Sequence, residues 1–204
     1  MKTKAIILIC LITFAISKPK VEFYVESLCP DCVGFLTTSY NNFLKQADHS
    51  DLADVTIYPY GNASEKQDGG KWSFVCQHGP NECYGNGYYE CANAKLGDVQ
   101  KAHEFIVCME ANIATHGRNF DLTAFHCLEN EPTVLSTIQL CAQDDSVVSP
   151  LMHIVALKTE SLVPKHTYVP WIVVDGVHDA DVENKIIADM YGYFKGKQQL
   201  KYLK

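Results

Sequence analysis

The sequence has no surplus of positive charge. It contains 17 basic residues (Lys and Arg) against 24 acidic ones (Asp and Glu), which gives a formal net charge of −7 at pH 7. Because no stripe of basic residues is present, we do not expect a nucleic acid as a partner. An acidic surface keeps a protein soluble and loses charge as carboxylates are protonated, which fits an acidic compartment. The chain also lacks repeats and low-complexity tracts, so its 204 residues suit one domain, or one domain with a large insertion.

Long apolar runs are missing too. Crossing a bilayer takes ~20 consecutive apolar residues, and the longest run, Ala5 to Ala15, is well short of that. It follows two lysines and leads to small residues at positions 15 and 17, which is typical of a secretory signal peptide rather than a membrane anchor. We expect cleavage after Ser17, so that residues 1–17 are the signal peptide and residues 18–204 form a mature chain with no membrane anchor.

Cysteine, by contrast, is plentiful. The chain has nine, of which Cys10 lies in the expected signal peptide. The remaining eight are an even number in a chain expected to enter the oxidising secretory pathway, a pattern typical of disulfides. The triplet Asn62-Ala63-Ser64 is a glycosylation sequon among Gly and polar residues, which predicts a glycan on Asn62. Together these features predict a secreted, lysosomal or endosomal protein.

Two of the cysteines, Cys29 and Cys32, form a C-x-x-C pair between a strand and a helix. Residues 21–25 (VEFYV) have the apolar–polar pattern of a strand, and apolar residues recur at helical spacing over residues 33–46. Pro30 falls in the first turn of that helix, where a missing N–H costs least. The pair is therefore expected at a helix N-terminus.

A thiol at a helix N-terminus has a lowered pKa, because exposed N–H groups and the helix dipole stabilise the thiolate. The thiolate is the form that attacks a disulfide, and a nearby second thiol resolves the mixed disulfide that results. We therefore assign Cys29 as the catalytic nucleophile and Cys32 as the resolving thiol. The carboxylate of Asp31 works partly against this, since it disfavours another negative charge beside the pair.

Two other interpretations of the pair are a structural disulfide and a zinc site. In a secreted protein, a C-x-x-C alone supports a structural disulfide about as well as catalysis. A zinc site needs a second pair of Cys or His at matching spacing, which Cys76 and Cys83 do not supply. We expect no metal, and no cofactor other than a small-thiol reductant such as cysteine or glutathione.

The rest of the chain alternates between strand and helix patterns. Residues 55–60 predict a second strand, and residues 61–93, rich in Gly, Asn and Cys, predict an irregular segment held by disulfides. Helical periodicity dominates from residue 96 to about 159. A buried strand is expected over residues 169–174 and a terminal helix over residues 179–194, with Asp179 as its N-cap.

Val169 and Pro170 stand at the start of the last predicted strand. One interpretation is an ordinary proline at the beginning of a strand. The other, which the C-x-x-C motif favours, is the cis-proline of a thioredoxin-like fold. Such a proline packs against the reactive pair and exposes backbone to which an extended substrate can bind. On this interpretation Val169 and Pro170 are substrate-binding residues.

Residues 76–91 (CQHGPNECYGNGYYEC) resemble the signature C-Q-H-G-x2-E-C-x2-N-x4-C of the gamma-interferon-inducible lysosomal thiol reductase family. The matching positions are Cys76, Gln77, His78, Gly79, Glu82, Cys83, Asn86 and Cys91. Residues 106–110 and 168–171 also look like family segments, and the resemblance runs from about Val21 to Gly176.

The resemblance implies an α/β protein with a thioredoxin-like fold and a helical, disulfide-rich insertion at about residues 61–160, within a single domain over residues 18–204. It implies reduction of protein disulfides at acidic pH in endosomes or lysosomes, with Cys29 and Cys32 as the catalytic pair. The expected partners are disulfide-containing protein substrates.

The remaining signature residues are expected to be structural. The other cysteines form disulfides whose pairing is left open, although a second redox centre is the alternative for those of the signature; they are Cys76, Cys83, Cys91, Cys108, Cys127 and Cys141. His78 is either hydrogen-bonded scaffolding or a proton donor. Gln77, Glu82 and Asn86 are expected to brace a loop.

Two alternatives to a reductase use the same scaffold. An oxidase or isomerase of the secretory pathway differs in reduction potential, which the sequence does not give. A secreted binding or modulatory protein has no need of a free thiol pair, so the presence of both Cys29 and Cys32 favours the enzyme.

Overall fold

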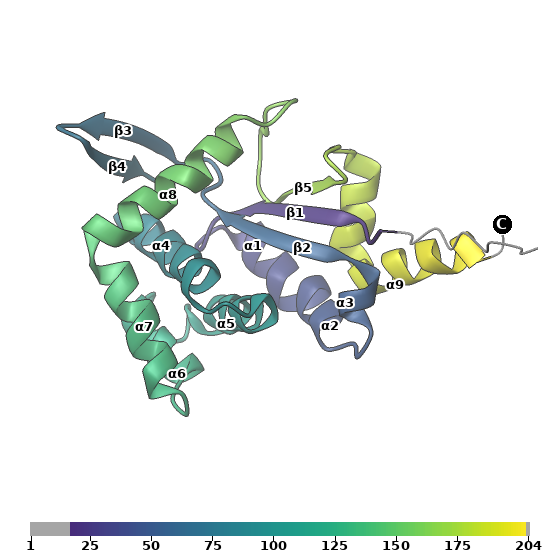
Figure 1. Cartoon of the computed structure of the whole chain (residues 1–204), viewed down its shortest axis with the longest axis horizontal. Helices are drawn as coiled ribbons and strands as arrows, with labels where there is room; N and C mark the ends of the chain where they lie inside the picture. Colours follow the sequence, from purple (N-terminus) through teal and green to yellow (C-terminus); the bar gives the residue numbers. More distant parts are fainter. Residues whose placement is uncertain (1–16, 203–204) are drawn as a thin grey trace, which may run out of the picture.

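A small three-stranded sheet lies at the centre of the molecule, in a computed structural model that describes residues 17–202 (Figure 1). Most of the expected signal peptide, residues 1–16, lies outside the described residues. The strands are β1 (Lys20–Val25), β2 (Asp54–Pro59) and β5 (Trp171–Val174), in the order β2-β1-β5. β1 runs parallel to β2 and antiparallel to β5. The three strands lie where their apolar patterns predicted them.

Alternate side chains of β1 point to opposite faces of the sheet and enter different clusters. Val21, Phe23 and Val25 belong to the main core, whereas Tyr24 packs with Trp171 on the other face. The ring of Phe23 meets that of Phe35 edge to face, with centroids 4.9 Å apart. This contact packs the helix that follows the C-x-x-C pair onto the sheet.

The predicted helix over residues 33–46 is one helical run with a π-helical turn in its middle. Its parts are α1 (Pro30–Phe35), η1 (Leu36–Tyr40) and α2 (Asn41–Leu44), and the short helix α3 (His49–Leu52) follows before β2. The hydroxyl of Ser39 in η1 donates to the carbonyl of Ile186 (2.6 Å) and accepts from the N–H of Met190 (2.9 Å). These bonds join the run to the C-terminal helix.

That C-terminal helix, α9 (Ala180–Tyr202), bends at Asp189, where the backbone leaves the helical region. Asp179 caps it as expected, since its carboxylate accepts the N–H groups of Asp181 and Val182. Within residues 17–202, no helix has both the length and the apolar character that a membrane crossing requires.

Between β2 and β5 the chain forms a β-hairpin and a group of helices, which Figure 1 shows largely on the side of the sheet away from α9. The elements are β3 (Ser64–Asp68), β4 (Lys71–Val75), α4 (Pro80–Lys95), α5 (Val99–Asn112), α6 (Phe120–Cys127), α7 (Pro132–Gln143) and α8 (Asp145–Glu160). The hairpin rests on α8 through Trp72, whose ring stacks on His153 at 3.7 Å.

The expectation of an irregular segment over residues 61–93 is wrong, because this stretch forms the β3–β4 hairpin and most of α4. Four of its glycines, at positions 61, 69, 70 and 79, have positive φ and lie in the connections, but Gly85 and Gly87 lie inside α4. A Cβ on Gly85 would lie 2.1 Å from Cζ of Phe120, so only glycine lets α4 approach this ring. Asn86 beside it is fully buried. The glycine and asparagine that are typical of a loop therefore lie on the buried face of a helix here.

The six cysteines outside the C-x-x-C pair form three disulfides in the hairpin and helical region. Cys76–Cys83 joins the end of β4 to α4, Cys91–Cys141 joins α4 to α7, and Cys108–Cys127 joins α5 to α6. Cys29 and Cys32 are free thiols. The described chain is thus a mixed α/β structure with two small sheets and three disulfides.

Candidate active site

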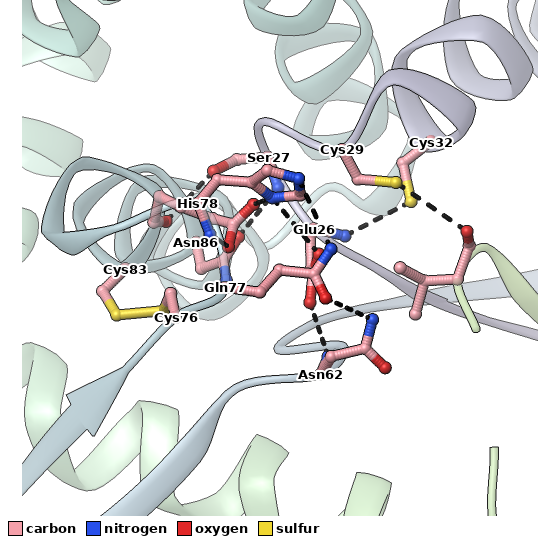
Figure 2. A network of polar contacts seen from close by, with 12 residues as sticks. Glu26, Ser27, Cys29, Cys32, Asn62, Cys76, Gln77, His78, Cys83 and Asn86 are labelled. Carbon is pink, nitrogen blue, oxygen red and sulfur yellow. Dashed lines mark hydrogen bonds and ion pairs between the residues drawn. A yellow bond between two sulfur atoms is a disulfide. The ribbon is translucent and has the colours of Figure 1, made fainter. Parts of the chain in front are cut away.

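The two free thiols lie at the start of α1, just beyond the end of β1 (Figure 2). Cys29 is the N-cap residue, and its carbonyl accepts the N–H of Val33 at 2.9 Å, which closes the first helical turn. Cys29 is 5% exposed and Cys32 is fully buried. Cys29 is therefore the sulfur that a substrate can reach more easily.

The position of Cys29 stabilises its thiolate. A hydrogen bond from the Cys32 thiol, together with the backbone N–H groups of Asp31 and Cys32, lowers the pKa of Cys29 to about 6 against the opposing effect of burial. The negative charge of Asp31 raises the pKa slightly, but its side chain is exposed to solvent. The helix N-terminus thus outweighs the neighbouring carboxylate.

Cys32 behaves in the opposite way. Burial, followed by its interaction with Cys29, raises the pKa of Cys32 well above its ordinary value. The backbone N–H of Glu26 points at its sulfur at 3.5 Å. One thiol of the pair is therefore ready to ionise, while the other stays protonated until its environment changes.

Val169 and Pro170 reach the pair from the far end of the sequence. The thiol of Cys29 donates to the carbonyl oxygen of Val169 at 3.8 Å, and the Val169–Pro170 peptide bond is cis. Both residues are buried. The structure thus brings together four residues that the sequence analysis singled out.

The signature on α4 supports the link between β1 and Cys29. The backbone N–H of Ser27 donates to Oδ1 of Asn86 at 2.9 Å, and the Ser27 hydroxyl donates to the carbonyl of Glu82 at 3.0 Å (Figure 2). A Cβ on Gly85 would lie 2.4 Å from the Ser27 hydroxyl oxygen, so glycine also permits this close approach. The bracing role expected of Asn86 is present, but it acts from a helix.

Glu26 is fully buried in the same link and contacts the turn after β2. Its Oε1 accepts the backbone N–H of Asn62 at 2.5 Å, and Gly61, with a φ of +55°, leaves no room for a Cβ, which would lie 2.3 Å from Cγ of Glu26. The exposed Asn62 side chain donates to Oε1 of Gln77 at 2.9 Å. Glycosylation of Asn62 stays a prediction.

His78 lies between two buried carboxylates, Glu26 and Glu82. Its Nδ1 forms a short hydrogen bond with Oε2 of Glu82 and is 3.7 Å from Oε2 of Glu26. Both glutamate side chains are fully buried, and that of His78 is 32% exposed. One oxygen or nitrogen from each residue lies within 4.8 Å of the others, a grouping that can hold a metal ion. The scaffold role of His78 is therefore present in the form of a His–Glu pair.

A third buried carboxyl group, that of Glu110, lies on α5. Burial raises the pKa of Glu110 well above its ordinary value, against the opposing effect of the nearby Tyr89 hydroxyl. Sequence reasoning gave no role to Glu110, Glu26 or Ser27. For Glu110 a signal was available, since it follows Ile106 by one helical turn on the buried side of α5.

This arrangement is suited to thiol–disulfide exchange. A low-pKa thiol at a helix N-terminus attacks disulfides at lower pH than an ordinary thiol, and a buried partner thiol can close a disulfide with it. The other described cysteines are already paired.

Several known proteins are similar to this chain in sequence. The family described as "Gamma interferon inducible lysosomal thiol reductase" matches residues 20–131, which include the C-x-x-C pair and the signature. The "Gamma-interferon-inducible lysosomal thiol reductase" of Carassius auratus is 38% identical over 181 residues, covering 87% of this chain and 68% of the relative. The protein of the same name from Mus musculus is 35% identical over 156 residues, covering 76% of this chain and 60% of the relative.

A plant relative extends the comparison. The "Gamma-interferon-responsive lysosomal thiol protein" of Arabidopsis thaliana is 30% identical over 186 residues, covering 90% of this chain and 74% of the relative. The aligned part of this chain thus spans between 60% and 74% of the length of these three relatives. The chain belongs to the gamma interferon inducible lysosomal thiol reductase family.

Proposed function

We propose that this protein is a thiol–disulfide oxidoreductase that reduces protein disulfides through Cys29 and Cys32. The observation that carries the proposal is the contrast between the two free thiols. Cys29 caps α1 and has a pKa lowered to about 6, mainly by a hydrogen bond from Cys32, whereas burial raises the pKa of Cys32. Membership of a family whose relatives are named thiol reductases supports the direction of the reaction.

The reaction takes two exchange steps. The Cys29 thiolate attacks one sulfur of a substrate disulfide, and the other substrate sulfur leaves as a thiolate that takes up a proton. Cys32 then loses its proton and attacks the Cys29 sulfur, which releases the first substrate sulfur as a second thiol. The substrate has gained two electrons and two protons. Two molecules of a small thiol such as cysteine or glutathione then reduce the Cys29–Cys32 disulfide back to the dithiol and are themselves oxidised to a disulfide.

We propose that Val169 and Pro170 bind the substrate chain beside Cys29. The Val169 carbonyl, just before β5, is 3.8 Å from the Cys29 sulfur. Main-chain groups in this position can pair with an extended peptide, which gives affinity without strong sequence preference. This would place a substrate cystine over the reactive sulfur.

The same proposal includes a thioredoxin-like domain over residues 18–204. It is supported by the parallel β1–α1–β2 unit, the antiparallel β5 and the final helix α9, which together make a sheet-and-helix core. The inserted part, at about residues 61–160, holds the β3–β4 hairpin, helices α4 to α8 and all three disulfides.

An acidic compartment fits the chemistry of Cys29. With a pKa of about 6, about a tenth of Cys29 is thiolate at pH 5, whereas an ordinary thiol is almost fully protonated there. We propose that the protein enters the secretory pathway through residues 1–17 and acts in endosomes, lysosomes or outside the cell. The names of the relatives from Carassius auratus and Mus musculus include the word lysosomal.

A trapping experiment tests the proposed function. The Cys32→Ser variant should form a mixed disulfide with a disulfide-containing protein at pH 5, and mass spectrometry should locate the bond at Cys29. The Cys29→Ser variant is the matched control and should form no adduct and show no reductase activity. Activity that survives Cys29→Ser would contradict the assignment. Absence of reductase activity in the wild type, with excess small thiol across pH 4 to 8, would favour a binding protein instead.

A further inference from the structure

We infer that Glu26, His78 and Glu82 form a binding site for a divalent transition-metal ion of the zinc type, next to the thiol pair. The three residues come from two distant parts of the chain, since Glu26 follows β1, whereas His78 lies just before α4 and Glu82 lies in its first turn. They offer one imidazole nitrogen and two carboxylate oxygens. This donor set suits Zn²⁺, which binds His nitrogen and carboxylate oxygen at ~2.0–2.2 Å.

The distances between the donor atoms fit a single ion. The three atoms lie within 4.8 Å of one another, and Nδ1 of His78 is 3.7 Å from Oε2 of Glu26. Two ligands at ~2.1 Å from a tetrahedral ion are separated by ~3.4 Å. An ion would replace the proton now shared in the hydrogen bond between His78 and Glu82. Small side-chain movements therefore complete the coordination.

An unpartnered oxygen points into the same site. Oε2 of Glu26 is buried and has no hydrogen-bond partner, although Oε1 of the same carboxylate accepts from Asn62. A buried carboxylate oxygen without a partner is costly, and a cation removes that cost. The orientation of Oε2 towards His78 is therefore explained by a ligand that binds both groups.

The surroundings supply access and support. The His78 side chain is 32% exposed, so an ion can enter from solvent and keep an open position for water. The amide of Gln77 is 3.4 Å from Nε2 of His78 (Figure 2). Rotation of this amide would exchange the bond that its oxygen accepts from Asn62 for one from Nε2 of His78, which is how metal-bound histidines are commonly oriented. Oε1 of Glu82 accepts the backbone N–H of His78 at 3.0 Å.

The site is adjacent to the reactive pair, because the backbone N–H of Glu26 contacts the Cys32 sulfur. Ion binding would place positive charge three residues before Cys29. The inference does not depend on the proposed function, since the site contains neither thiol and can be tested in a chain that lacks both.

The test is a titration of the Cys29→Ser/Cys32→Ser double variant with Zn²⁺ at pH 7.5, followed by calorimetry, and with Co²⁺, followed by visible absorption. Removal of the thiols prevents binding at the C-x-x-C pair. We expect one Zn²⁺ per chain, and a loss of affinity of at least ~10-fold when His78→Gln or Glu82→Gln is added. If Glu82→Gln fails to fold, the result for His78→Gln decides the test, because the His78 side chain is partly exposed and its replacement disturbs the core less.

A matched control is a separate His–Glu pair, formed by His153 and Glu65 at 2.8 Å. Among the described residues, no third His, Cys, Asp or Glu lies close enough to this pair to complete a metal site. His153→Gln should leave Zn²⁺ affinity unchanged. The inference is overturned if the double variant binds no Zn²⁺. It is also overturned if adding His78→Gln lowers the Zn²⁺ affinity no more than adding His153→Gln does.

Discussion

Oδ1 of Asn86 accepts a hydrogen bond of 2.9 Å from the backbone N–H of Ser27, which ties α4 to the link that precedes Cys29. Asn86 is fully buried and belongs to the sequence signature. This signature residue makes no hydrogen bond to either thiol. It holds in place the backbone that leads into the C-x-x-C helix.

Replacement of Asn86 by Ala should loosen this link. Loss of the acceptor leaves a buried N–H unsatisfied, which costs about 1–3 kcal/mol of unfolding free energy. We expect lower stability in urea unfolding and slower disulfide reduction. Asn81→Ala is the matched control, because Asn81 on the same helix makes an exposed bond to the carbonyl of Arg118. Equal effects of both substitutions would contradict the anchoring role.

Gly85→Ala should be strongly destabilising. The added Cβ would lie 2.1 Å from Cζ of Phe120 and 2.4 Å from the Ser27 hydroxyl, so α4 or the Ser27 link has to move. We expect a loss of about 1–3 kcal/mol from overpacking, measured by thermal and urea unfolding, together with reduced reductase activity.

Gly34→Ala provides the opposite case. Gly34 also lies in a helix, α1, but a Cβ there meets nothing within 4 Å. Alanine should therefore stabilise the chain by about 0.5–1 kcal/mol through helix propensity. If Gly85→Ala proved as harmless as Gly34→Ala, the close packing of α4 against Phe120 would be wrong.

The disulfides should contribute to stability in order of the loops they close. Cys91–Cys141 spans 50 residues and Cys76–Cys83 spans 7. In the chain-entropy model, the first disulfide stabilises the folded state by about 4 kcal/mol and the second by about 2 kcal/mol, because each restricts the unfolded chain. Double Cys→Ala variants of each pair should reproduce this order in urea unfolding, and the reverse order would contradict it.

Stability should also depend on pH through the buried Glu110. Burial raises the pKa of Glu110 well above its ordinary value, so the folded chain holds it neutral where the unfolded chain ionises it. Its favourable contribution is complete below the unfolded pKa of ~4.5 and is lost as the pH rises towards the folded value. Burial also raises the pKa of Glu90 to about 7. For Glu90, this raised pKa corresponds to about 1–2 kcal/mol of unfolding free energy, once the partial exposure of its side chain to water is allowed for.

The measurement compares unfolding free energies of wild type and Glu110→Gln at pH 5.0 and 7.5. Because burial lowers the pKa of His103 to about 4, that residue contributes with the opposite sign, and the difference between the two proteins isolates Glu110. Glu110→Gln should gain stability relative to wild type as the pH rises. Glu104→Gln, on the exposed side of the same helix, is the control and should show no such trend.

Local pattern was enough to predict much of the fold. The strand at β1, the helix after Cys29 and the cap at Asp179 depend on short-range periodicity and on the geometry of helix ends. The contact between Val169 and Cys29 joins residues 140 apart, and only the resemblance to a known fold predicted it.

Other features depend on long-range packing and could not be read from the sequence. Gly85 lies inside a helix, where the ring of Phe120 packs against it, and no local pattern predicts that contact. The burial of Glu26 beside His78 follows from the way β1 and α4 meet. The pairing of the six cysteines likewise depends on which helices lie side by side.

The most direct test of the roles of Cys29 and Cys32 is the rate at which each thiol is alkylated as a function of pH. The C-x-x-C pair is first reduced under conditions that keep the other disulfides intact, and mass spectrometry then follows Cys29 and Cys32 separately. We predict that Cys29 reacts much faster than Cys32, with a rate that titrates with a pKa of about 6. A Cys29 profile with an ordinary thiol pKa of about 8.5, or faster reaction at Cys32, would contradict it.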